Sequence, residues 1–118
     1  MHVKIACIAM NSGDDMSANV EIIRMRVAEA AERGAQLVAT PENTFLMEYP
    51  GKLRLLYGEE DHPGVKASAE LAKQYGVWLL IGSVAVKVDD SQKTVNRSLR
   101  LEESSSEVIF DKEGIHIY

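Results

Sequence analysis

Cysteine is almost absent from this 118-residue chain, in which Cys7 is the only one. One thiol cannot close an internal disulfide, and this agrees with a reducing compartment. The three histidines, His2, His62 and His116, are scattered, so no spacing of cysteine and histidine indicates a metal centre. We therefore expect no metal and no other cofactor, and we expect the protein to be cytoplasmic.

Long hydrophobic runs and clusters of basic residues are also missing. The longest apolar run is residues 77–86; it includes a glycine and a serine and is too short to span a bilayer. The opening MHVKIACIAM lacks the apolar core and cleavage site of a secretory signal. The net charge is −5 and no stretch is strongly basic, so neither nucleic acid nor a membrane is expected as a partner.

What is present is ordinary globular material, with 46% hydrophobic and 26% charged residues, enough for one domain or part of one. Residues 2–10 are predicted to form a first strand. Its alternating residues are apolar on both sides, so we expect both faces to be buried. One side carries Val3, Ile5 and Cys7, and the other carries Ala6, Ile8 and Met10.

A helix is predicted from Ser17, as its N-cap, to about Arg33, with Gly34 ending it. Its apolar stripe is Val20, Ile23, Val27 and Ala30. A short strand over residues 36–40 follows, and strand, helix and strand together form a unit typical of parallel sheets.

Glu42 stands where this parallel unit would place a ligand, because ligands in such sheets bind beyond the carboxyl ends of the strands. It follows Thr40 and Pro41, and the proline favours an extended backbone for the residue before it. The residues alone leave two interpretations of Glu42: a solvated loop acid, or a working acid in a site.

The second half predicts a mixed sheet. A helix over residues 65–75, with Val65, Leu71, Ala72 and Ala69 inward and Gly76 as its stop, leads to a buried strand over residues 77–86. A turn at residues 88–93, a strand over residues 94–101 and a hairpin over residues 106–118 with a DKEG turn complete the pattern. The fold class is therefore α/β with a mixed, α+β-like sheet.

Three stretches in this order resemble the opening of the nitrilase superfamily, also called carbon–nitrogen hydrolases. They are KIACIAMNSGDDMSANVEIIRMRVAEAAERGAQLVATPENTF, LAKQYGVWLLIGSVAV and KTVNRSL. The resemblance covers residues 4–99 without large gaps. It implies that the chain, residues 1–118, is the N-terminal part of a carbon–nitrogen hydrolase domain. The complete domain would be a four-layer α-β-β-α sandwich, and its partners a small amide or nitrile substrate and further copies of itself.

The resemblance also implies a Glu-Lys-Cys catalytic set, in which Glu42 matches the general base. Hydrolysis of an amide or nitrile needs a nucleophile stronger than water, which a thiolate provides. A carboxylate can take the thiol proton, and a lysine ammonium can stabilise the charge that develops on the attacked group. The activity implied is hydrolysis of non-peptide carbon–nitrogen bonds.

The chain departs from this pattern at two of the three catalytic positions. No residue matches the nucleophile, because Cys7 lies within the first strand among apolar neighbours and is expected to be buried and inert. Lys112 matches the lysine only if Glu113 and Gly114 are inserted. In the register that we favour, DKEG is a turn, Tyr118 begins the lysine motif, and the lysine is the second residue after it.

The 118 residues alone are therefore predicted to be inactive, and to self-associate or be unstable, because half a sandwich leaves apolar strand faces in water. Tyr49, Tyr57 and Trp78 are predicted to pack or to form pocket walls, and Asn43 and Phe45 are candidates to line a substrate pocket. Two other functions stay open: a non-catalytic binding or assembly module on the same scaffold, and a small flavodoxin-like ligand-binding domain that uses NSGDD to hold a phosphate.

Overall fold

The computed structural model describes residues 2–47, 57–58, 60–87, 94–101, 108–111 and 114–116. Its elements in chain order are β1 (Ile5–Cys7), α1 (Met16–Glu32), β2 (Leu37–Ala39), α2 (Pro63–Tyr75), β3 (Trp78–Lys87), β4 (Thr94–Leu101), β5 (Val108–Asp111) and β6 (Gly114–His116). Neither of the described helices is long and apolar enough to cross a membrane.

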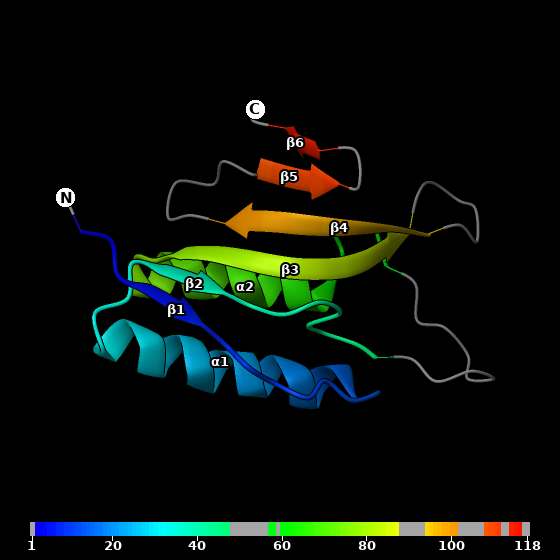
Figure 1. Ribbon diagram of the computed structural model, residues 1–118. Coiled ribbons are helices and arrows are strands. Elements are labelled where there is room, and N and C mark those ends of the chain that lie inside the picture. Colours follow the sequence, from blue (N-terminus) through cyan, green and yellow to red (C-terminus); the bar gives the residue numbers. More distant parts are fainter. Residues whose placement is uncertain are drawn as a thin grey trace.

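The six strands form one mixed sheet in the order β1–β2–β3–β4–β5–β6 (Figure 1). β1 pairs with β2 and β2 with β3 in parallel, whereas the pairs β3–β4, β4–β5 and β5–β6 are antiparallel. This confirms the predicted mixed α/β sheet. It does not support the flavodoxin-like alternative, because in that fold β1 lies between two other parallel strands, whereas here it is first in the order.

Both helices cover the same face of the sheet, and one hydrophobic core lies between them and the strands (Figure 1). The apolar stripe of α1 is confirmed, since Ile23, Val27 and Ala30 are buried and Val20 is half-buried. The strand residues that face the helices alternate along β2, β3 and β4, as a half-covered sheet requires. They include Val38, Leu79, Ile81, Val86, Leu99 and Leu101.

The other face of the sheet is open among the described residues, and this corrects two predictions about β1. Its strand is shorter than predicted, and Ile5 and Cys7 are exposed rather than buried. Register places Ile5 beside Leu37 and Leu37 beside Trp78, which is itself 39% exposed. The prediction assumed that both faces of the sheet are covered, but the helices α1 and α2 form a single layer that covers only one face.

Trp78 lies on this open face and forms part of a cavity wall there, as predicted. The guanidinium of Arg100 on β4 lies 4.4 Å from the centre of its ring, within the range of a cation–π contact. Together with Val3, Gln36 and Leu37, these two side chains line a shallow cavity on the sheet.

Both helix starts differ from the predictions. Asp15, not Ser17, is the N-cap of α1, because its carboxylate accepts a hydrogen bond from Ala18 N–H at 3.1 Å. α2 begins two residues early, at Pro63, a residue suited to the first helical position. Its inward side includes Val65, Leu71 and Ala72 as predicted, and Ala67 and Ser68 besides, but Ala69 is exposed.

The helix ends and the last strands agree with the sequence. Gly34 and Gly76 both have the left-handed backbone that ends a helix (φ 85° and 61°). β4 has the predicted bounds, and β5 and β6 form the predicted hairpin with Asp111 opposite Gly114. The predicted turn at residues 88–93, Tyr49 and the residues between Asp111 and Gly114 lie outside the described residues.

Candidate functional site

Glu42 lies three residues beyond the end of β2, at the edge of the sheet where the parallel strands have their carboxyl ends. Its side chain is exposed, and among the described residues no hydrogen bond or ion pair engages its carboxylate. The structure therefore presents a free acid at the edge of the sheet where the sequence predicted one.

The loop that carries Glu42 is bound to β3. Asn43, the next residue, has a left-handed backbone with φ 49°, which asparagine adopts more readily than most residues. Its N–H donates to Ser83 Oγ at 2.9 Å, and Thr44 N–H donates to the Ser83 carbonyl at 3.3 Å. These contacts hold the turn against a strand some forty residues away in the chain.

Two buried threonines support the same loop from within. Thr40 Oγ1 and Thr44 Oγ1 lie 2.8 Å apart, and Thr44 Oγ1 donates to the carbonyl of Pro41. Gly82 N–H donates to Thr40 Oγ1 at 3.2 Å, so the pair is also joined to β3. Sequence analysis missed this network, because hydroxyls spaced four residues apart give no signal of their partner strand.

Gly82 allows the loop to lie directly on β3. A Cβ atom at this position would lie 2.3 Å from the Thr40 carbonyl oxygen and 2.6 Å from the carbonyl carbon and oxygen of Pro41. Only glycine permits so close an approach of one backbone to another. Ser98 on β4 donates to the Gly82 carbonyl, which extends the contact to β4.

The segment after β1 is attached to the same loop. Ser12 Oγ donates to the Thr44 carbonyl at 2.8 Å. Asn19, buried on α1, donates to the carbonyls of Phe45 and Gly13 at 2.7 and 2.9 Å, and accepts from Gly13 N–H. The stretch NSGDD thus serves to hold α1 and the Glu42 loop together, with its glycine N–H directed at a side-chain amide.

Phe45 is a core residue and not a pocket wall, since it is only 1% exposed. Its ring packs against His62, with 5.5 Å between ring centres, and Tyr57 lies on another side of the same histidine at 5.7 Å. His62 Nδ1 accepts a hydrogen bond from Gly64 N–H at 3.1 Å and so caps α2. Burial lowers the pKa of His62 below its ordinary value of 6.5.

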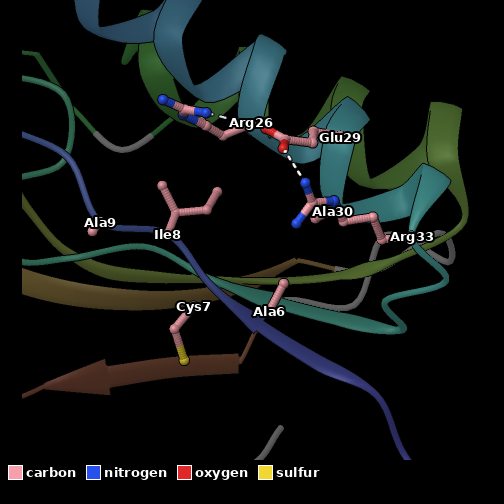
Figure 2. A pocket seen from close by; sticks show the side chains of 8 residues that line it. All are labelled: Ala6, Cys7, Ile8, Ala9, Arg26, Glu29, Ala30 and Arg33. Atoms are coloured by element: carbon pink, nitrogen blue, oxygen red, sulfur yellow. Dashed lines mark hydrogen bonds and ion pairs between the residues drawn. The ribbon is translucent and has the colours of Figure 1, made fainter.

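Cys7 is not joined to an acid or base by any contact among the described residues. Figure 2 shows its sulfur directed away from the cavity between β1 and α1, where Glu29 binds both Arg26 and Arg33 at 3.1 and 3.0 Å. No group of three His, Cys, Asp or Glu side chains in the described part of the chain could hold a metal ion.

Lys112, the second predicted catalytic residue, lies outside the described residues. The described residues before and after it, Asp111 and Gly114, belong to β5 and β6. β5 is three strands from β2 in the sheet, which is a lateral separation of about 14 Å at roughly 4.8 Å per strand. The end of β5 nevertheless points to the same edge as the end of β2 (Figure 1).

Comparison with known proteins gives one consistent family. Residues 4–116 match the carbon–nitrogen hydrolase family. The chain is 28% identical to a deaminated glutathione amidase from Yersinia enterocolitica, over 99% of this chain and 41% of the relative. It is 29% identical to nitrilase homolog 2 from Dictyostelium discoideum, over 98% of this chain and 35% of that relative. The chain thus spans well under half the length of these curated relatives.

The fold is that of solved members of the CN-hydrolase superfamily. A protein of this superfamily from Xanthomonas campestris, solved with an arsenic adduct in its active site, aligns with a TM-score of 0.80 and 19% identity over 95% of this chain and 41% of its own.

Proposed function

The chain belongs to the carbon–nitrogen hydrolase family, and from this membership we propose that it forms the N-terminal part of an enzyme that hydrolyses a small amide or nitrile. In this proposal Glu42 is the general base of a Glu-Lys-Cys set. The nucleophilic cysteine is not among these 118 residues, and in the favoured register neither is the lysine. The enzyme would act in the cytoplasm as a homo-oligomer.

Glu42 would carry protons through both halves of the reaction. Its carboxylate takes the thiol proton while the sulfur bonds to the amide carbon, and the lysine ammonium stabilises the negative charge on the oxygen. The carbon–nitrogen bond then breaks, and the proton leaves with ammonia or an amine. In the second half, Glu42 takes a proton from water, which attacks the thioester and releases the acid and the thiol.

The observation that supports this role most strongly is the attachment of the Glu42 loop. Glu42 lies beyond the carboxyl end of β2, in a loop bound to β3 through Asn43, Thr44 and Gly82. A catalytic group gains rate when its position is fixed before the substrate arrives. A solvated loop acid would need none of these buried contacts.

An amide is the favoured substrate class. The curated relative from Yersinia enterocolitica is an amidase, and an amidase from Nesterenkonia sp. has been solved with acrylamide added at its active-site cysteine. Amide and nitrile substrates both end as a carboxylic acid and ammonia, the amide by taking up one water molecule and the nitrile two, so the choice between them is tested by supplying each substrate in turn.

The test is ammonia release by the full-length product of the gene that encodes these residues. Glu42→Gln keeps the size of the side chain and removes the base, so turnover is expected to fall by about 10²–10⁴-fold. Glu32→Gln, an exposed acid on α1, is the matched control and should leave turnover unchanged. Full activity in Glu42→Gln would contradict the proposal.

The 118-residue chain by itself is expected to release no ammonia. Turnover by this chain that survives Cys7→Ala but is lost in Glu42→Ala would refute that expectation.

A non-catalytic assembly module is the second candidate, and one observation favours it: the only thiol of the 118 residues is in β1, and no base among the described residues contacts it. This candidate predicts a defined complex with a full-length family member and no ammonia release.

A further inference from the structure

We propose that the hydroxyls of Thr44 and Ser83 are positioning groups for Glu42, because they hold the two peptide groups on either side of it. This inference rests on the proposed function of Glu42 and adds the means by which its backbone is fixed. Neither side chain would touch the substrate. Both would act through Glu42.

The first peptide group joins Pro41 to Glu42, and its carbonyl accepts a hydrogen bond from Thr44 Oγ1. The second joins Glu42 to Asn43, and its N–H donates to Ser83 Oγ at 2.9 Å. A peptide group is planar, so a hydrogen bond to either of its ends restrains the whole plane. Glu42 Cα is the point where these two restrained planes meet, which limits the rotation that could redirect its side chain.

The hydroxyl protons can be assigned from elementary chemistry. The Pro41 carbonyl can only accept, so the proton of Thr44 Oγ1 points to it. Thr44 Oγ1 is then the acceptor for Thr40 Oγ1 at 2.8 Å, a better contact than the 3.5 Å from Thr40 Oγ1 to the Leu80 carbonyl. Thr40 Oγ1 in turn accepts from Gly82 N–H. The result is a directed chain of hydrogen bonds from β3 to Pro41.

Burial makes these hydroxyls hard to replace with water. Thr44 is fully buried, and Ser83 is only 4% exposed. When Thr44 loses its hydroxyl, the Pro41 carbonyl and the Thr40 hydroxyl lose a partner together. The Pro41–Glu42 peptide group is then free to rotate, and a displacement of about 1 Å in a catalytic group can lower the rate about 100-fold.

The test uses substitutions that separate the hydroxyl from the shape of the side chain. Thr44→Val keeps the shape and removes the hydroxyl, whereas Thr44→Ser keeps the hydroxyl. Ser68→Ala is the matched control, because it removes a fully buried hydroxyl whose hydrogen bond, 2.8 Å long, goes to the Gly64 carbonyl of its own helix and not to the Glu42 loop. Glu42→Gln is measured beside them in the full-length gene product.

Thr44→Val is expected to lower kcat for amide hydrolysis about 100-fold with KM changed less than threefold, and Thr44→Ser to restore kcat to within threefold of wild type. Ser68→Ala should lower thermal stability without changing kcat. If Thr44→Val keeps its kcat while Glu42→Gln loses it, the positioning role is wrong and the proposed function stands. If Glu42→Gln keeps full activity, the proposed function is wrong.

Hydrogen exchange in the full-length gene product tests the positioning of Glu42 by Thr44 and Ser83 independently of catalysis. The Asn43 amide, which donates to Ser83 Oγ, should exchange at least tenfold faster in Thr44→Val and in Ser83→Ala, and at the wild-type rate in Thr44→Ser and Ser68→Ala. Unchanged Asn43 exchange in Thr44→Val overturns the inference. Should Thr44→Val not fold, Ser83→Ala is judged by the same criterion.

Discussion

Gly82→Ala is the substitution that most sharply tests how the Glu42 loop is held. The added Cβ would lie 2.3 Å from the Thr40 carbonyl oxygen, and ordinary van der Waals contact begins at 3.4 Å, so about 1 Å of separation must be created. The obstacle is the backbone of Thr40 and Pro41 rather than the end of a flexible side chain. The loop must therefore move as a unit, away from β3.

The cost follows from two terms. Overpacking a close contact costs about 1–3 kcal/mol, and the Gly82 N–H bond to Thr40 Oγ1, at 3.2 Å, contributes about 1 kcal/mol that the movement would forfeit. We expect Gly82→Ala to lower the free energy of unfolding by about 2–4 kcal/mol, measured by urea denaturation with circular dichroism detection.

Gly13→Ala is the control for this measurement, because nothing lies within 4 Å of a Cβ at Gly13 and its φ is not positive. It should change the free energy of unfolding by less than about 1 kcal/mol. A free energy of unfolding for Gly82→Ala within about 0.5 kcal/mol of wild type, an amount typical of a surface substitution, would contradict the close packing of the Glu42 loop on β3.

Two further predictions concern other parts of the chain. The stability contribution of His62 should be fully present above pH 6.5 and should be lost as the pH falls toward the lower pKa of the folded state, because the unfolded chain binds the proton more readily in that range. In His62→Asn the free energy of unfolding should therefore depend less on pH. An unchanged dependence on pH would contradict this prediction. The 118-residue chain should self-associate through its open sheet face. Ile5→Lys, at a residue 56% exposed on β1, should therefore shift sedimentation toward the monomer, whereas Met25→Lys, at a residue 67% exposed on α1, should not. Equal sedimentation of both variants would contradict this prediction.

Local sequence patterns predicted most of the secondary structure. The stripe of Ile23, Val27 and Ala30 places one face of α1 against the sheet, and glycine at positions 34 and 76 ends both helices. β4 was predicted to the residue, because a turn-rich stretch on each side limits it. These features depend on neighbours within a few positions, which the sequence displays directly.

Exposure was predicted less well where it depends on distant layers. Cys7 was expected to be buried because both sides of its strand are apolar, yet it lies on the face that no described element covers. The spacing of apolar residues predicted that Ala69 faces inward. The buried side of α2 instead includes Val65, Ser68 and Leu71, and Ala69 is exposed. Such errors arise because the repeat of apolar residues indicates a helix or a strand, but does not show which of its faces another element covers.

The candidate site shows the same division. A motif and its position after a strand sufficed to predict where Glu42 lies. The contacts that hold it, from Gly82 and Ser83, come from residues about forty positions away and involve hydroxyls and backbone groups with no periodic signal. The N-cap of α2 was also missed, since histidine is not among the usual capping residues.

The central claim is that Glu42 takes the proton of the nucleophilic thiol. Its most direct test is the intact mass of the full-length gene product, quenched with acid within seconds of mixing with excess amide substrate. We predict an acyl adduct on a cysteine of the wild type, with release of at least one equivalent of ammonia, and no adduct in Glu42→Gln. Acylation of Glu42→Gln at the wild-type rate, or a wild type that never carries an adduct and releases no ammonia, would contradict the claim.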